Sequence, residues 1–172
     1  METIVVSDTN ILIDLVDIGL LEQFLLLPFG IHTTDIVIAE ITIEEQKAAV
    51  LSVIEKAGIK VKTYTPDEML KLFSFISSKR RTYDLHPADF SVWQYSSEND
   101  YTLLTGDGNL RKAASADGVE VHGTIFLIDK MVEYQILTPT LAADKLELLY
   151  TINSRLPKSE IDLRIVKWRG SL

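Results

Sequence analysis

Short β-rich segments alternate with longer helical patterns along most of this 172-residue chain. The segments "TIVVS" at 3–7 and "YTLLT" at 101–105 have the composition of buried strands, and a helical pattern follows each of them. When a helix separates two strands, the second strand usually lies parallel to the first, because the helix returns the chain across the sheet. The alternation therefore predicts an α/β fold with a mainly parallel sheet and helices on both of its faces.

Turn and capping residues set the expected bounds of these segments. Pro66 and Pro87 favour the first turn of a helix, Gly58 favours a helix end, and Thr33 or Thr34 can cap a helix. The expected strands are 3–7, 31–33, 59–63, 101–105 and 119–121. The expected helices are 10–17, 19–27, 35–57, 66–79, 87–99, 109–116 and 124–135, with two more after Pro139 and Pro157.

The length suits one domain with a single hydrophobic core. No flexible linker precedes residues 138–172, so we expect them to form a helical extension of the domain that residues 1–137 build. The chain has no cysteine, which excludes disulfides, zinc–thiolate sites and thiol catalysis. It also lacks an export-signal pattern and any apolar stretch near the ~20 residues that span a bilayer. A cytoplasmic protein is therefore expected.

The formal net charge of −8 argues against a broad phosphate-binding surface. It does not exclude a nuclease, because carboxylates that bind divalent cations add negative charge that the metal ions offset. Local basic groups could contact a nucleic acid, although each could equally be a solvated surface. Three such groups stand out: Lys79–Arg81, Arg111–Lys112, and the C-terminal Arg164, Lys167 and Arg169.

Two acidic residues lie at the carboxyl ends of predicted strands. Asp8 follows "IVVS", and Asp107 follows "LLTG". Each could cap the next helix, which is a common role of aspartate, and Asp107 could also belong to an Asp-Gly turn. Each could instead be a ligand, because parallel sheets bind ligands outside the carboxyl ends of their strands. The local sequence leaves both interpretations open.

Two further acids are expected at the same edge of the sheet. Glu40 shares a helical face with Ile36 and Val37, where a carboxylate is costly unless it is paired or binds a metal ion. Glu40 could also lie at the rim of that face and reach solvent. Asp89 falls in the first turn of the helix that Pro87 begins, where the helix dipole favours an acid.

These four acids together point to one place at the sheet edge. Two of them end strands, and two lie in early turns of helices that are expected to begin at the same edge. Mg²⁺ and Mn²⁺ prefer oxygen ligands of this kind. A carboxylate pocket with one or two such ions can activate a water molecule and stabilise a displacement at a phosphoryl group.

Four segments resemble the motifs of the PIN-domain family: "VVSDTNILID", "TTDIVIAEI", "LHPADFSVW" and "LLTGDGNLRKAA". They follow the family's order and span residues 4 to about 117. The resemblance implies a compact three-layer α/β/α sandwich and a metal-dependent ribonuclease. It also implies roles for six residues: Asp8, Glu40, Asp89 and Asp107 as catalytic ligands of Mg²⁺ or Mn²⁺, and Asn10 and Thr105 as polar supports.

The C-terminal part, from "HGTIFLIDKMVE" to "RLPKSEIDLRIVKW", resembles a prokaryotic PIN subgroup related to VapC-type toxins. This resemblance implies an endoribonuclease that is the toxin of a toxin–antitoxin pair, with RNA as substrate and an antitoxin protein as partner. Homodimers are also common in the family. The sequence departs from many members at Gly106 and Gly108, where they carry another acid or a basic residue.

Other classes of protein also place acids at strand ends. A receiver domain needs an acidic pair near its first strand and a lysine after its last, whereas "VVSD" supplies one acid and "VEVHGT" supplies no lysine. A HAD-type phosphatase needs an aspartate two residues after Asp8, and this chain has Asn10 there. The remaining alternative is a PIN-like protein- or RNA-binding module with little or no catalytic activity. The presence of all four acids argues against it.

Overall fold

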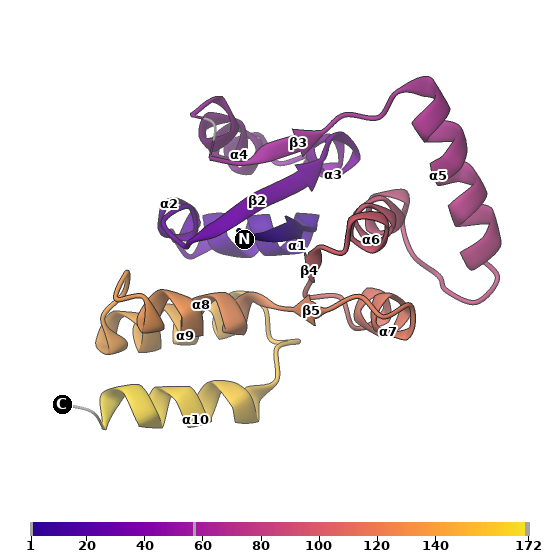
Figure 1. Ribbon diagram of the computed structural model, residues 1–172. Helices are drawn as coiled ribbons and strands as arrows, with labels where there is room; N and C mark the ends of the chain where they lie inside the picture. The colour runs from indigo at the N-terminus through magenta and orange to yellow at the C-terminus, as the bar shows by residue number, and fades with distance from the viewer. Residues whose placement is uncertain (1, 57, 171–172) are drawn as a thin grey trace.

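The computed structural model describes residues 2–56 and 58–170. Within this range, a five-stranded sheet lies at the centre, with the strand order β3-β2-β1-β4-β5 (Figure 1). All neighbouring strands are parallel, which confirms the predicted α/β fold with a mainly parallel sheet. The strands are β1 (Thr3–Ser7), β2 (Phe29–Thr34), β3 (Lys60–Lys62), β4 (Thr102–Leu104) and β5 (Val121–His122).

Helices cover both faces of the sheet and make the three layers of an α/β/α sandwich. One face is covered by α6, with α5 and α7 beside it, and the other by α1, with α2, α4 and α8 around it. The first layer contains α5 (Pro66–Lys79), α6 (Pro87–Asn99) and α7 (Gly108–Ala116). The second contains α1 (Thr9–Asp17), α2 (Leu21–Phe24), α4 (Glu44–Glu55) and α8 (Thr124–Glu133), while α3 (Asp35–Glu40) contacts both α1 and α6.

The core of the domain comes from the apolar faces of the two central helices. Phe90 and Trp93 of α6, and Ile11, Leu12 and Leu15 of α1, are completely buried. In both helices these residues recur at spacings of one, three or four positions, which places them on one face against the sheet.

The single helix expected over residues 35–57 is wrong. Thr34 caps α3 through the Val37 N–H, as the sequence predicted, but α3 ends at Glu40 and a second helix begins at Glu44. Between them, Ile41 and Ile43 have extended backbones. Three successive β-branched residues disfavour helix at 41–43, and Ile41 is buried in the core. The helix expected over 19–27 is also shorter, since α2 spans only four residues.

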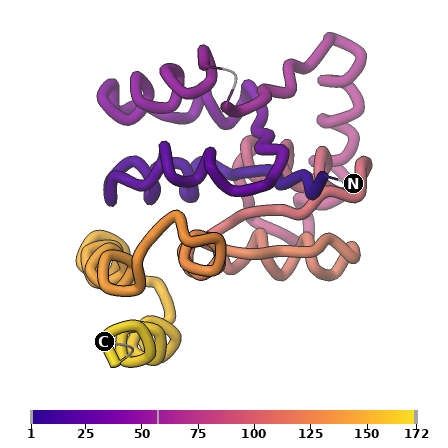
Figure 2. The backbone as a smooth tube through the Cα atoms, turned by 60° about the vertical axis from the view of Figure 1, so that its left-hand side comes forward, coloured from indigo at the N-terminus to yellow at the C-terminus, as the bar shows by residue number. Residues whose placement is uncertain are grey.

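The two helices expected after Pro139 and Pro157 are α9 (Pro139–Ile152) and α10 (Lys158–Arg169). They pack side by side, α9 also packs on α8, and Ile161 and Trp168 bury the inner face of α10. Figure 2 shows this pair at the end of the molecule farthest from α5. The boundary expected between residues 137 and 138 stays a prediction. In the described range, no helix has the length and apolar character needed to cross a membrane.

The order in which the chain adds strands to the sheet reverses between β1 and β4, which are neighbours at its centre. The chain builds one half of the sheet with β2 and β3, and then crosses to the other half for β4 and β5. The connection after β1 leads to α1 on one face, and the connection after β4 leads to α7 on the other. In α/β sheets the crevice at such a point, outside the carboxyl ends of the two strands, is where ligands bind.

Candidate active site

Asp8 lies at this crevice, directly after β1, and is only 2% exposed. Its backbone N–H donates to the Leu104 carbonyl at the end of β4, with an N–O distance of 3.0 Å. Its Oδ1 accepts the Ile11 N–H at 2.9 Å and so caps α1, while its Oδ2 accepts the Thr105 hydroxyl. Asp8 is therefore a helix cap that also stands at the sheet edge, and the two interpretations of its role are compatible.

The segment after β4 repeats this arrangement with Asp107. The Asp107 N–H donates to Thr105 Oγ1 at 3.0 Å, so the buried Thr105 links the two aspartates. Asp107 Oδ1 accepts the Asn109 and Leu110 N–H groups, both at 2.8 Å, and thereby caps α7. Thr105 thus contacts Asp8 directly and fixes the backbone of Asp107.

Glu40 and Asp89 approach the crevice from α3 and α6. The sequence left two positions open for Glu40, and the structure shows the one at the rim: α3 ends at this residue and its side chain is exposed. Glu40 Oε2 accepts the Thr9 hydroxyl at 2.5 Å, and Thr9 immediately follows Asp8. Asp89 is half-buried in the first turn of α6 and accepts the His86 N–H at 2.9 Å.

The electrostatics show that these acids influence one another. Burial raises the pKa of Asp8 from its ordinary 3.8 to about 7, and the negative charges of Asp89 and Asp14 contribute to that rise. Burial also raises the pKa of Asp89, as do the charges of Asp107 and Glu40. Asp89 is therefore coupled to the other three predicted site acids. Across the described residues, none of the four forms an ion pair with a basic side chain.

The donor atoms at this edge have the chemistry that a hard divalent cation requires. In the described part of the chain, one oxygen of each of Glu40, Asp89 and Asp107 accepts no hydrogen bond. The four carboxylates are each held by the protein, however, and among residues 2–56 and 58–170 no three acids or histidines enclose a point that could hold an ion. The residue types thus fit Mg²⁺ or Mn²⁺, although their side chains are not gathered around one position.

Asn10 and Asp14 line a hollow of about 270 Å³ beside Asp107. Asn10 is exposed, and within the described range its side chain makes no hydrogen bond to Asp8, so Thr105 and the Ile11 N–H hold that carboxylate. Asn10 nevertheless lines the same hollow as Asp107.

Asp14 was not selected by the sequence analysis. It is buried, and its Oδ2 accepts hydrogen bonds from the Thr124 hydroxyl at 3.2 Å and the Asn153 amide at 3.4 Å. It thereby joins α1 to α8 and to the end of α9. One signal could have revealed it: Asp14 is three residues after Ile11, on the apolar face of the predicted helix.

The chain was compared with curated proteins and with models of protein families. No relative among the curated proteins matches it. The family model of DUF3368, described as a PIN domain, matches residues 4–169 and so includes α9 and α10. PIN domains are in general metal-dependent nucleases, and such an activity agrees with four carboxylates placed around the crevice between β1 and β4. The match covers nearly the whole chain, and this protein therefore belongs to the PIN-domain family.

Proposed function

We propose that this protein is an endoribonuclease that cleaves RNA phosphodiester bonds with Mg²⁺ or Mn²⁺. The observation that carries the proposal is the crevice at the carboxyl ends of β1 and β4. Four carboxylates, those of Asp8, Glu40, Asp89 and Asp107, lie near it and act on one another electrostatically, and within the described residues none of them pairs with a basic side chain. Asp8 is buried without a cationic partner, which is costly to a fold, and a bound cation would offset that cost.

The side chains around the crevice have separate tasks in this proposal. The open oxygens of Glu40, Asp89 and Asp107 would hold the cation, and Asp8 would join them from the crevice floor. A divalent cation supplies charge stabilisation at the phosphoryl group and lowers the pKa of bound water. Thr105 hydrogen-bonds to Asp8 and to the Asp107 backbone, so both carboxylates would face the cation in a defined arrangement.

Several finer predictions belong to this proposal. The choice of RNA over DNA and a homodimer rest on the resemblance to the PIN-domain family. The role of a toxin, with an antitoxin protein as partner, rests on the resemblance of the C-terminal part to VapC-type toxins. A cytoplasmic location is a separate prediction from the sequence. The choice of metal ion rests on the donor set, which is made entirely of oxygen atoms.

The test is a cleavage assay on labelled RNA with Mg²⁺, with Mn²⁺ and with EDTA. We expect cleavage only when a divalent cation is present. Asp8→Asn should reduce the rate by at least about a hundredfold, since it removes a charge from the cation site. Asp144→Asn is the matched control, because Asp144 is exposed and pairs with Arg169 on the surface of α9 and α10, and it should retain full activity.

Two outcomes would contradict the proposal. Cleavage that persists in EDTA, or an Asp8→Asn variant with full activity, would show that the protein is not a metal-dependent nuclease with Asp8 in its site. If the wild-type protein binds RNA or a co-purified protein but cleaves no RNA with either cation, the binding-module alternative replaces it.

A further inference from the structure

Thr9 joins two of the site acids, although these acids come from different parts of the chain. It directly follows Asp8, is the first residue of α1, and is only 8% exposed. Its hydroxyl donates to Glu40 Oε2 at the end of α3, with an O–O distance of 2.5 Å. Because Asp8 and Thr9 are neighbours in the chain, this hydrogen bond sets the position of the Glu40 carboxylate relative to Asp8.

The place of Thr9 in α1 explains why its hydroxyl is free to contact another element. Inside a helix, a threonine hydroxyl commonly donates to the backbone carbonyl three or four residues earlier. For Thr9 those residues are Val6 and Val5, which belong to β1, so the preceding helical turn does not exist. Threonine is also stiff about its first side-chain torsion, because it is β-branched. Thr9 therefore offers one donor in a nearly fixed direction.

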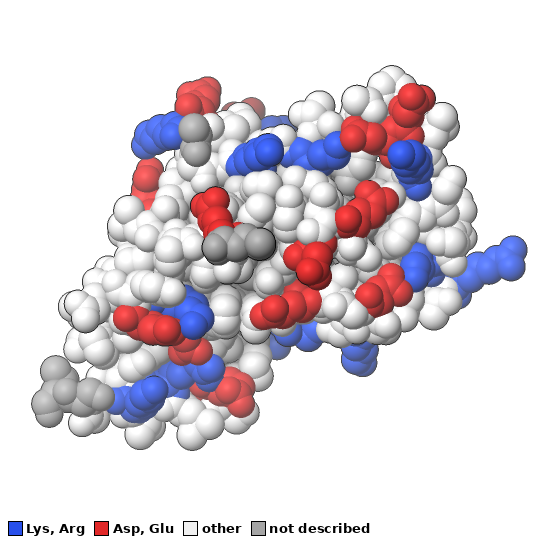
Figure 3. Space-filling view, in the orientation of Figure 1, with Lys and Arg blue, Asp and Glu red and all other residues white. Residues whose placement is uncertain are grey.

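Glu40 depends on this contact more than most acids of the chain would. Acidic and basic side chains lie next to one another at several places on the face drawn in Figure 3. Glu40 is exposed, and among the described residues it has no basic partner and accepts no hydrogen bond except that of Thr9. An ordered glutamate gives up much of its rotamer freedom, and the Thr9 hydrogen bond offsets this cost.

The neighbouring acids act against this position of Glu40. Burial raises the pKa of Asp89, and the negative charges of Asp107 and Glu40 add to that rise, so Glu40 lies close enough to Asp89 to be repelled by it. The exposed Glu40 side chain could reduce this repulsion by turning into solvent. The hydrogen bond from Thr9 opposes that movement and keeps the carboxylate at the crevice.

We infer that Thr9 is a positioning residue for the cation. Its hydroxyl holds Glu40 beside Asp8 before a cation binds, so the open oxygen of Glu40 becomes a ligand without further ordering of the side chain. Removing a partner that orients a metal ligand typically costs about 10- to 100-fold in metal affinity. Thr9 acts through Glu40 and takes no part in the chemistry. The inference rests on the proposed function and deepens it, because it names what sets the geometry of the cation site.

The test compares two variants of the full chain that differ in one hydroxyl. Thr9→Val has nearly the shape of threonine but no donor, and Thr9→Ser restores the donor. Titration with Mn²⁺, followed by the electron paramagnetic resonance signal of the free ion, gives Kd without any RNA. Thr9→Val should raise Kd at least about tenfold, and Thr9→Ser should stay within about threefold of the wild type.

Unfolding in urea without divalent cations separates positioning from a purely structural role. Water can replace the hydroxyl as a partner of the exposed Glu40, so Thr9→Val should keep nearly the wild-type midpoint. Thr138→Val is the matched control. It removes the hydroxyl that caps α9 through the Leu141 N–H, at the opposite end of α9 from the hollow beside Asp107. This control should lower the midpoint and leave the Kd of Mn²⁺ unchanged.

A double variant tests whether Thr9 acts through Glu40. Glu40→Ala removes the acceptor and should itself weaken Mn²⁺ binding. Adding Thr9→Val to Glu40→Ala should then raise Kd by less than about twofold, because two residues that form one contact do not have additive effects.

The outcomes separate this inference from the proposed function. Equal Mn²⁺ affinity of wild type and Thr9→Val, or an undiminished effect of Thr9→Val in the Glu40→Ala background, would overturn the inference even if RNA cleavage is normal. Mn²⁺ binding that depends on Thr9, without RNA cleavage, would overturn the nuclease and support the inference. A wild-type chain that binds no Mn²⁺ would overturn both.

Discussion

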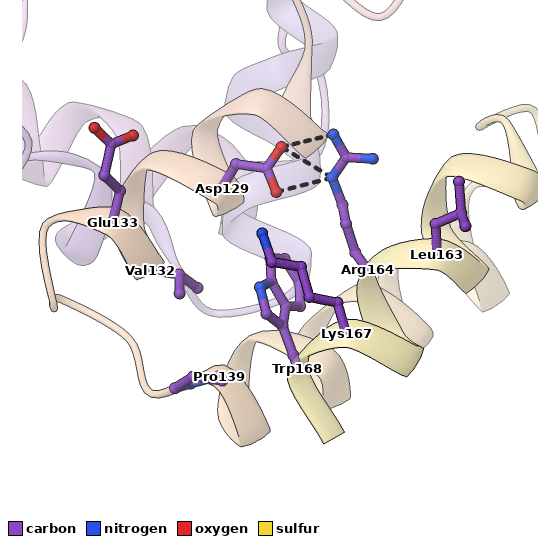
Figure 4. A pocket seen from close by; sticks show the side chains of 8 residues that line it. All are labelled: Asp129, Val132, Glu133, Pro139, Leu163, Arg164, Lys167 and Trp168. Atoms are coloured by element: carbon purple, nitrogen blue, oxygen red, sulfur yellow. Dashed lines mark hydrogen bonds and ion pairs between the residues drawn. The ribbon is translucent and has the colours of Figure 1, made fainter. Parts of the chain in front are cut away.

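Among the described residues, the acids around α10 are paired with arginines, whereas the four acids at the β1–β4 crevice have no basic partner. Around α10, Arg164 holds Asp129 with two parallel hydrogen bonds of 2.8 and 2.7 Å, which Figure 4 shows beside a hollow of about 650 Å³. Arg164 also pairs with Glu160, and Arg169 pairs with Asp144 and Glu147. At the crevice, the described residues supply no such partner to any of the four acids.

This difference appears in the direction of the pKa shifts. Arg169 lowers the pKa of Glu147, as expected for an acid that gains a cationic partner. Burial and neighbouring acids raise the pKa of Asp8 and of Asp89. Charges that stabilise the fold are therefore found around α10, whereas the charges at the crevice oppose folding, as is common at functional sites.

The largest expected effect on stability is at Asp8. An acid whose pKa rises from 3.8 to about 7 on folding stabilises the fold fully below pH 3.8, and this contribution is lost as the pH rises through 7. In EDTA at about pH 8, Asp8→Asn should therefore be more stable than wild type, by up to about 4 kcal/mol. The difference should shrink toward pH 4. Denaturant unfolding across this range measures it, and a variant that is less stable at every pH contradicts the comparison.

A bound divalent cation should also offset the destabilisation that the buried Asp8 charge causes, without a mutation. At about a hundred times its Kd, Mn²⁺ should raise the unfolding free energy of the wild type by about 2.7 kcal/mol. Asp107→Asn should reduce this gain, whereas Asp144→Asn should keep it, because Asp144 is exposed and pairs with Arg169 on the surface of α9 and α10. Thermal unfolding with and without Mn²⁺ measures this gain in both variants. An equal gain in the two would contradict the assignment of the cation to the crevice.

A smaller effect is expected where α10 meets α8. Arg164→Met removes the paired hydrogen bonds to Asp129 but keeps most of the side-chain length. Both partners are partly exposed, so the loss should be about 1 kcal/mol. Unfolding in urea measures it. An unchanged free energy of unfolding would show that this pair does not stabilise the fold and would contradict the comparison.

The smallest effect is expected at Arg169, whose pairs lie on the surface. Arg169→Gln should shift the unfolding midpoint by about 1 °C at low salt and by less at high salt, since surface pairs are screened. Calorimetry at two ionic strengths provides the measurement. A large shift that does not depend on salt would show that this pair is more than a surface contact.

Much of the site could be predicted from local sequence, but the surroundings of each acid could not. Asp8 and Asp107 follow strands, and both do cap the next helix. Whether Glu40 is buried or reaches solvent was left open by the sequence, and the structure decides it because the helix that carries Glu40 ends there. Asn153 gave no signal, because its relevance depends on a contact with Asp14, which lies more than a hundred positions away.

The sequence by itself determined the alternation of strands and helices, the caps that begin them, and the acids that follow β1 and β4. These features depend on propensity and on neighbours a few residues apart. Only the tertiary structure decided that β4 lies beside β1, so that Thr105 reaches Asp8, and that the α9–α10 connection lies over α1. Such contacts arise from packing of distant segments into one core, and the free energy that selects them is shared by the whole domain.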